Sequence, residues 1–242
     1  MREHIVSDQQ PTIVLVHGAF AESASWNGVI ERLGTYNVLA AANPLRSLAG
    51  DAAYLADVIR GVGGPVILVG HSYGGMVITQ AAGDNPTVRA LVYVNAFAPE
   101  TGESAFGLSG QFPGSTLAGT LVQYPVSTGG NEVAIGQDDF HGQFAADAPS
   151  DLAALMARTQ RPITEQALND SLTGAPAWRS LPSWFVFGDA DMNIPVAAHR
   201  FMAERAKPQG QRELPGGSHA MAVARPGEVA ETIIEAVRSV SG

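Results

Sequence analysis

Ser72, His219 and Asp191 are the residues whose types and chain order could do nucleophilic chemistry. A serine hydroxyl becomes a useful nucleophile only when a base within hydrogen-bond reach takes its proton and a third group orients that base. Histidine is the usual base, and a buried carboxylate fixes its tautomer and stabilises its charged form. The three residues could therefore form a triad for acyl transfer if the fold brings them together.

The setting of Ser72 favours this interpretation. It lies in Gly70-His71-Ser72-Tyr73-Gly74, which has the pattern Gly-x-Ser-x-Gly. Residues 66–69 form an apolar run typical of a strand buried on both faces, and apolar residues recur at helical spacing from Tyr73 onward. The pattern alone is weak, but strand, sharp turn and helix are the context of a nucleophile elbow, which lifts a serine hydroxyl above a sheet edge.

The base and the acid are chosen by their places in the chain. Of the six histidines, His219 fits best because it lies in a Gly-rich loop after the last predicted strand. This gives the order serine, acid, histidine that accompanies the elbow. Asp189 and Asp191 both follow a buried strand. The loop before Ile194-Pro195 favours Asp191, and Asp189 is then interpreted as an Asx-turn residue that holds the loop.

Two backbone N–H groups are expected to stabilise the oxyanion of acyl transfer. Tyr73 supplies one because it follows the candidate nucleophile, and the loop after the first strand supplies the other. Ala19 is the candidate there, since Gly18 lets its backbone approach closely, and Phe20 is the alternative. The candidates for substrate contact are Phe20, Trp178 and His141.

Strands and helices alternate along most of the chain and must position these residues. Strands are predicted at residues 12–16, 37–42, 66–69, 88–94, 183–187 and near 212–214. Because helical crossovers join them, they imply an α/β fold with a doubly wound, mostly parallel sheet and helices on both faces. Ser72, Asp191 and His219 all follow strands, and in such sheets chemistry gathers at the carboxyl ends.

The alternation stops between about residues 98 and 181. This region is rich in Gly, Pro, Ser and Thr, and its one clear helix is predicted at residues 151–159. We expect a cap inserted into a single domain of residues 1–242, with aromatic side chains that shape an apolar acyl or alcohol pocket. A separate small domain is the alternative.

Composition limits the classes of function. The 242-residue chain has a formal net charge of −9 and no Lys/Arg run, so it lacks the footprint of a nucleic-acid or anionic-membrane binder. The sequence contains no cysteine, which excludes disulfides, thiolate metal sites and cysteine catalysis. Residues 1–10 lack the apolar segment of a secretory signal, and no apolar run is long enough to span a membrane. We therefore expect a cytoplasmic protein, with its assembly left open between a monomer and a homodimer.

These motifs resemble the α/β-hydrolase superfamily, and most closely the compact branch of plant methylesterases and hydroxynitrile lyases with bacterial relatives. The resemblance covers nearly the whole chain outside the insertion and is carried by Val16-His17-Gly18-Ala19 with Ser25-Trp26, Gly70-His71-Ser72-Tyr73-Gly74-Gly75, Gly188-Asp189-Ala190-Asp191 with Ile194-Pro195, and Gly217-Ser218-His219-Ala220-Met221. It implies a triad of Ser72, His219 and Asp191. It also implies an oxyanion hole made by the backbone N–H groups of Ala19 and Tyr73.

Two departures from the resemblance favour hydrolysis. Hydroxynitrile lyases carry a threonine after the position of His17 and a lysine after that of His219, where Gly18 and Ala220 stand here. Haloalkane dehalogenases carry an aspartate in place of Ser72. The resemblance thus implies a serine hydrolase, without cofactor or metal, that cleaves a small neutral carboxylic ester or lactone through an acyl-enzyme. A C–C bond lyase or cofactor-free oxygenase on the same scaffold and a ligand-binding protein with little turnover remain open as alternatives.

Overall fold

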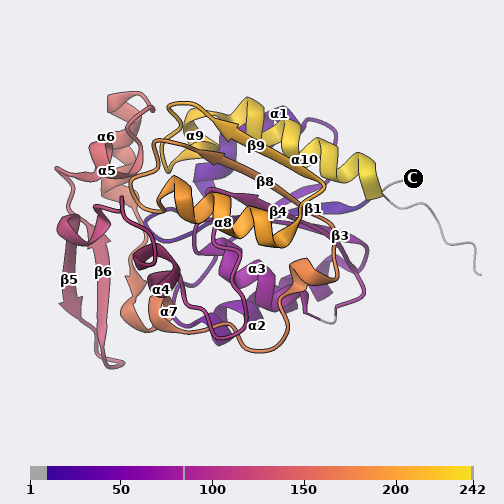
Figure 1. Cartoon of the computed structure of the whole chain (residues 1–242), viewed down its shortest axis with the longest axis horizontal. Coiled ribbons are helices and arrows are strands. Elements are labelled where there is room, and N and C mark those ends of the chain that lie inside the picture. Colours follow the sequence, from indigo (N-terminus) through magenta and orange to yellow (C-terminus); the bar gives the residue numbers. More distant parts are fainter. Residues whose placement is uncertain (1–9, 84, 241–242) are drawn as a thin grey trace, which may run out of the picture.

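A computed structural model of the chain describes residues 10–83 and 85–240. Within these residues, six strands form one central sheet whose neighbouring strands are all parallel (Figure 1). In spatial order they are β2 (Val38–Ala41), β1 (Thr12–Val16), β3 (Val66–His71), β4 (Val88–Val94), β8 (Ser183–Gly188) and β9 (Gly210–Leu214). The predicted doubly wound α/β fold is confirmed. Of residues 1–10, whose sequence lacks the apolar segment of a secretory signal, only Gln10 lies within the described residues.

Alternate side chains of the central strands enter two apolar layers. Val14 and Leu68 pack on one side, whereas Ile13, Ile67 and Val69 pack on the other. The first side is covered by α2 (Leu48–Val62), α3 (Gly74–Ala82) and α8 (Val196–Ala206). The second is covered by α1 (Asn27–Leu33), α9 (Met221–Ala224) and α10 (Pro226–Val240). No helix in the described ranges combines the length and apolarity that a membrane crossing requires.

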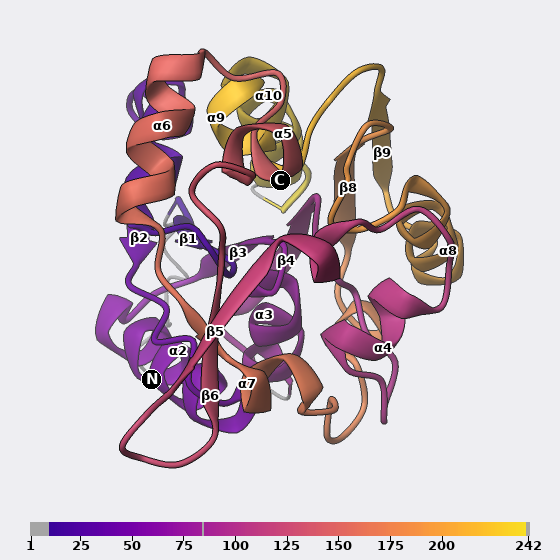
Figure 2. The same cartoon turned by 90° about the vertical axis from the view of Figure 1, so that its left-hand side faces the viewer.

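The segment between β4 and β8 folds into a cap beyond the end of the central sheet. Figure 2 shows its long hairpin crossing in front of the strands. The cap contains an antiparallel sheet of β5 (Leu121–Pro125), β6 (Asn131–Ile135) and β7 (Ile163–Thr164), with helices α4 (Ala105–Gly110), α5 (Phe140–Phe144), α6 (Ser150–Thr159) and α7 (Glu165–Asn169) and the short 3₁₀ turns Leu117–Thr120 and Ala177–Arg179. Its side chains Val133, Phe140 and Ile163 are buried in the same apolar cluster as Val14 and Leu68. Cap and sheet therefore share one core.

Candidate active site

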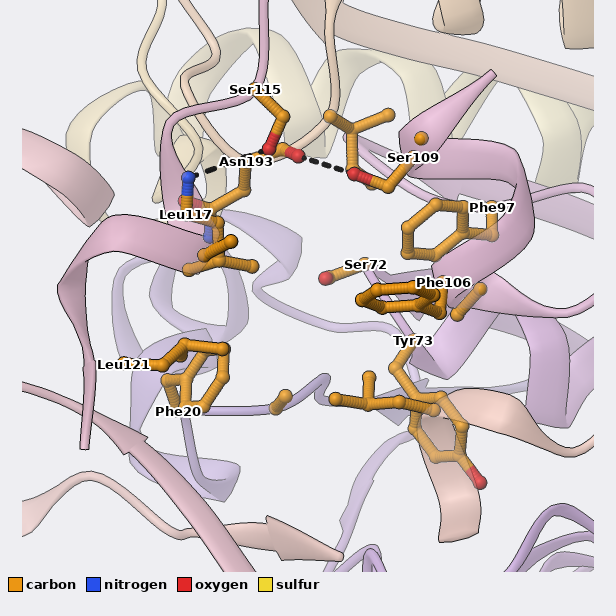
Figure 3. A pocket seen from close by; sticks show the side chains of 16 residues that line it. Phe20, Ser72, Tyr73, Phe97, Phe106, Ser109, Ser115, Leu117, Leu121 and Asn193 are labelled. Atoms are coloured by element: carbon orange, nitrogen blue, oxygen red, sulfur yellow. Dashed lines mark hydrogen bonds between the residues drawn. The ribbon is translucent and has the colours of Figure 1, made fainter. Parts of the chain in front are cut away.

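Ser72 lies on a tight turn between β3 and α3. Its φ of +54° is in the left-handed region, which costs a residue with a side chain about 1–3 kcal/mol. The flanking glycines allow the turn, because a Cβ on Gly74 would lie 2.3 Å from the carbonyl oxygen of Val16, and one on Gly70 would lie 2.7 Å from that of Gly74. The backbone N–H of Ser72 is held by the carbonyl of Asn95 at 3.1 Å. The predicted elbow geometry is thus present, with the hydroxyl pointing into a cavity (Figure 3).

The loop after β1 lies directly against this turn. A Cβ on Gly18 would come within 2.6 Å of the Cβ of Ser72, so only glycine permits the approach. The backbone N–H of Phe20, the alternative oxyanion donor, donates to the carbonyl of Arg161 in the cap at 3.0 Å. It is therefore already hydrogen-bonded within the protein. Within the described ranges, no acceptor takes a hydrogen bond from the backbone N–H of Ala19 or of Tyr73.

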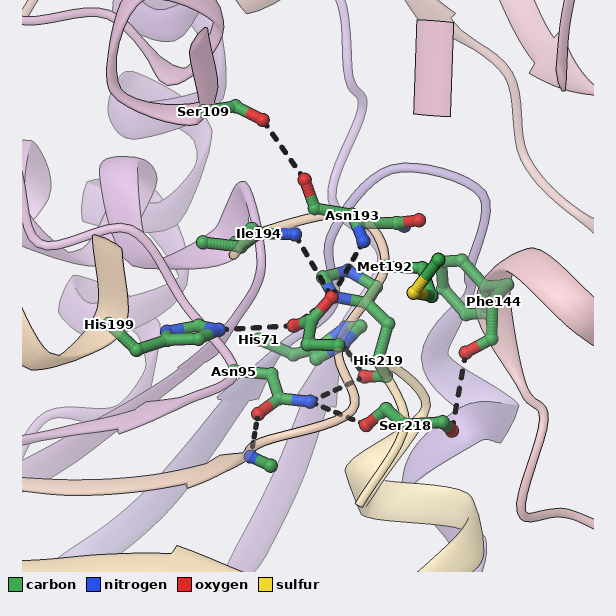
Figure 4. A network of polar contacts seen from close by, with 12 residues as sticks. His71, Asn95, Ser109, Phe144, Met192, Asn193, Ile194, His199, Ser218 and His219 are labelled. Atoms are coloured by element: carbon green, nitrogen blue, oxygen red, sulfur yellow. Dashed lines mark hydrogen bonds and ion pairs between the residues drawn. The ribbon is translucent and has the colours of Figure 1, made fainter. Parts of the chain in front are cut away.

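His219 and Asp191 form a buried pair, with 2.8 Å between His219 Nδ1 and Asp191 Oδ2. The other carboxylate oxygen accepts the backbone N–H groups of Asn193 and Ile194 at 2.8 and 2.9 Å (Figure 4). Asp189 lies apart from the pair and instead accepts the N–H of Gly216 at 2.7 Å. The acid and the candidate base are therefore held by the loops after β8 and β9.

A second histidine, His199, contacts the same carboxylate oxygen. Its Nε2 lies 3.0 Å from Asp191 Oδ2, and its ring stacks on Phe187 with centroids 5.1 Å apart. Burial raises the pKa of Asp191, but the charges of and hydrogen bonds from His219 and His199 outweigh burial and hold that pKa well below its usual value. Sequence reasoning gave His199 no role. Its place in the first turns of the helix that follows Asp191 is the signal that could have revealed it.

The backbone of His219 is fixed from two sides. Asn95 Nδ2 donates to the carbonyls of Ser218 and His219 at 2.6 and 3.2 Å, while its Oδ1 accepts the N–H of Gly188 at 2.8 Å. His71 Nε2 donates to the carbonyl of His219 at 2.9 Å. Burial, followed by the neighbouring His219, lowers the pKa of His71 to about 3, so this ring is neutral at pH 7. Asn95 was also missed by sequence reasoning.

The outer nitrogen of the candidate base has no partner. In the described part of the chain, His219 Nε2 is buried without a hydrogen bond, and none joins it to Ser72 Oγ. The ring packs edge-on against Phe144, with centroids 5.0 Å apart. Hydrogen bonds between a nucleophile and its base are often long without substrate and shorten in the complex. No group of three or more His, Asp or Glu among the described residues could hold a metal ion.

A family model described as "Alpha/beta hydrolase family" matches residues 13–232. The chain belongs to this family. A carbendazim hydrolyzing esterase from Nocardioides sp. (strain SG-4G) is 44% identical over 95 residues, which cover 32% of this chain and 39% of that relative. The match thus spans well under half of the relative's length.

Two solved structures share the fold of this α/β hydrolase. Polyneuridine aldehyde esterase superposes with a TM-score of 0.79 at 19% identity, over 94% of this chain and 99% of that one. Tomato methylketone synthase I complexed with 2-tridecanone superposes with a TM-score of 0.78 at 19% identity, over 96% and 99%. At this identity the likeness shows the architecture alone.

The cavity of this α/β hydrolase at Ser72 has a volume of about 220 Å³. It is lined mainly by apolar side chains and by no charged one: Ala19, Phe20, Ser72, Tyr73, Phe97, Ala105, Phe106, Ser109, Gly110, Ser115, Leu117, Ala118, Leu121, Leu168, Asn193 and Ile194. Among the three predicted substrate contacts, Phe20 lines it. Trp178 does not, since its indole N–H donates to the carbonyl of Pro99 at 2.9 Å, and His141 Nε2 lies 3.1 Å from the carbonyl of Ala148.

Proposed function

We propose that this α/β hydrolase is a serine esterase that cleaves small, neutral carboxylic esters or lactones through an acyl-enzyme. The observation that carries the proposal is the buried Asp191–His219 hydrogen bond of 2.8 Å, combined with Ser72 on its strained turn at the same edge of the sheet. An uncharged apolar cavity favours an uncharged substrate, because an ionised group there would lose its hydration without a partner. The name of the carbendazim hydrolyzing esterase, 44% identical over 95 residues, supports ester cleavage.

In the proposed mechanism, Ser72 Oγ attacks the carbonyl carbon while His219 Nε2 takes the hydroxyl proton. His219 then gives this proton to the leaving alkoxide, and the acyl group stays on the serine. Water attacks the acyl-enzyme with His219 again as base, which releases the carboxylic acid product and restores the free Ser72 hydroxyl. Asp191 stabilises the imidazolium of His219 during both acylation and deacylation. Ala19 and Tyr73 N–H groups would bind the oxyanion, each contributing about 3 kcal/mol of transition-state stabilisation.

The test is hydrolysis of p-nitrophenyl acetate and butyrate and of simple lactones by wild type, Ser72→Ala and Ser115→Ala. Ser115 is a matched control because it lines the same cavity without lying on the elbow. Ser72→Ala is expected to lose on the order of 10⁴- to 10⁶-fold in kcat, whereas Ser115→Ala keeps its rate. A phosphonate should add to wild type and Ser115→Ala but not to Ser72→Ala, as read by intact mass. Turnover retained by Ser72→Ala would contradict the proposal.

One observation favours a second candidate. The unpartnered Nε2 of His219 could act as a base directly on a bound substrate, without an acyl-enzyme. This suits a C–C bond lyase or a cofactor-free oxygenase on the same scaffold. In that case wild type would turn over no ester, and His219→Ala would lose an activity that Ser72→Ala keeps.

A further inference from the structure

A second cavity, of about 360 Å³, adjoins the first at Phe20. Phe20 is the one residue that lines both cavities within the described ranges. The second cavity is otherwise bounded by the segment after β1, the start of α1, α6 and the short helix α9, and its lining includes Glu22, Leu152 and Leu155. Phe20 therefore lies where the candidate active site and this second space come together.

The walls of the second cavity are mostly apolar, and part of that surface faces water. Leu155 and Leu152 on α6 are 57% and 37% exposed, which is unusual for large apolar side chains on one helix face. Apolar surface that remains exposed in this way often marks a site that a ligand covers. Glu22 is the one charged residue among the described lining residues, so the chemistry suits an alkyl or aryl group.

The backbone of Phe20 is held in place more firmly than its ring. Its N–H is tied to the carbonyl of Arg161, and its φ of +60° is held by the loop that packs on the elbow. The buried ring meets Phe144 edge-on, with centroids 6.4 Å apart. A change in the χ1 angle of Phe20 would move the ring without displacing the loop backbone.

We propose that the second cavity binds the apolar tail of the ester substrate, and that Phe20 is the partition that determines how long a tail the enzyme accepts. The inference rests on the proposed function and deepens it by naming a substrate class: esters with an extended alkyl or aryl chain. The shared wall at Phe20 identifies the occupant, since a tail that leaves the reacting carbonyl past Phe20 enters this space.

The experiment compares Leu155→Glu with wild type on p-nitrophenyl esters from acetate to dodecanoate, and on alkyl acetates from ethyl to decyl. Leu155 is exposed, so the substitution is compatible with folding, but it places a charge on the cavity wall. Leu39→Glu on β2 is the control, because Leu39 is 39% exposed and lines neither cavity. Each methylene housed in the cavity is worth roughly fourfold in KM. Leu155→Glu should therefore lose about tenfold or more in kcat/KM on the longest esters, with acetate unchanged.

Two further variants test the partition. Phe20→Ala should move the preference toward longer chains, and Phe20→Trp toward shorter ones, each measured as a ratio to acetate within the same variant. If the substitutions change the chain-length preference in the p-nitrophenyl series, the cavity holds the acyl half of the ester. If they change it in the alkyl acetate series, the cavity holds the alcohol half.

Failure of this inference differs from failure of the proposed function. If wild type hydrolyses short esters and Leu155→Glu has the wild-type profile on both series, the tail site is overturned and the esterase stands. Calorimetric binding of 2-decanone, an unhydrolysable ketone, gives a readout without turnover. Weaker binding by Leu155→Glu alone would support the cavity even if no ester is cleaved, and equal binding by all variants would overturn it.

Discussion

Replacing His199 by leucine tests whether the second histidine supports the Asp191–His219 pair. Asp191 accepts hydrogen bonds from two backbone N–H groups and from His219, and lies 3.0 Å from His199 Nε2. All of these contacts are buried, so the leucine variant leaves one position on a desolvated carboxylate oxygen without a donor. Such a loss at a buried charged acceptor costs about 1–3 kcal/mol.

The same loss should appear in the pKa of Asp191. At 1.36 kcal/mol per pKa unit, it corresponds to a rise of about one to two units. The folded pKa of Asp191 lies below its unfolded value, so its stabilisation is present above about pH 4 and is lost as pH falls toward the folded pKa. The deficit of His199→Leu should therefore be full at pH 7 and shrink only when the pH falls below the folded pKa of Asp191 in the variant, because a protonated carboxyl no longer needs the His199 donor.

The assay is urea unfolding of wild type, His199→Leu and His199→Gln at pH 7 and pH 3, together with ester kinetics at pH 7. Glutamine keeps an N–H donor and should restore most of the loss. We expect kcat of His199→Leu to fall by about tenfold, far less than the loss on the order of 10⁴-fold for Asp191→Asn, because the loop N–H groups still hold the carboxylate. Equal unfolding free energies for wild type and His199→Leu at pH 7 would refute this reasoning.

Three further predictions concern stability and the elbow. Burial lowers the pKa of His17 to about 4 and that of His71 to about 3, so both histidines take up protons on unfolding below pH 6.5. The free energy of unfolding should therefore fall by roughly 2 to 3 kcal/mol for each histidine between pH 7 and pH 4.5. A free energy of unfolding that urea titrations show to be independent of pH over this range would contradict the prediction. Gly18→Ala places a Cβ 2.7 Å from the carbonyl oxygen of His71 and should cost about 10²-fold in kcat/KM, whereas Gly61→Ala, with no atom near its Cβ, should cost nothing. Ser72→Gly should unfold at a higher temperature than Ser72→Ala, since left-handed backbone costs alanine about 1–2 kcal/mol, and the reverse order would show that the turn is unstrained.

Local sequence signals predicted the parts of the molecule in which neighbours in the chain determine the structure. The apolar run before Gly70 and the helical spacing after Ser72 correspond to β3 and α3, and the predicted helix at residues 151–159 corresponds to α6. The parallel direction of the strands could be predicted because helical crossovers join them and leave few alternatives. The glycines of the elbow could be interpreted from sequence, since each lies where a Cβ would meet backbone.

The cap hairpin could not be predicted in this way. Most side chains of β5 are exposed, so its sequence has no buried face to produce an alternating pattern. Its turn contains Gly129 and Gly130, both with positive φ, which is the signal that was available. The strand β7 has two residues and pairs with β6 across about thirty positions, which no local pattern encodes.

The missed polar residues have a related cause. Asn95 acts through partners that only the tertiary fold brings near, since it reaches Ser218 across more than one hundred residues. His199 lies only eight residues after Asp191 in the chain, but the direction of its side chain depends on how the helix packs. Both orient groups that were predicted, so the candidate site was found without the residues that hold it.

Backbone strain is concentrated where the candidate chemistry lies. Phe20, Ser72 and Asn95 follow β1, β3 and β4, and all three have positive φ. The registers Val16 with Gly70 and His71 with Val94 align these strand ends at one edge of the sheet. Conformations of this kind persist only where surrounding structure determines them, and the three strands are almost entirely buried. The apolar interior of the sheet is thus what allows one edge to hold a raised serine, a buried carboxylate and the neutral His71 together.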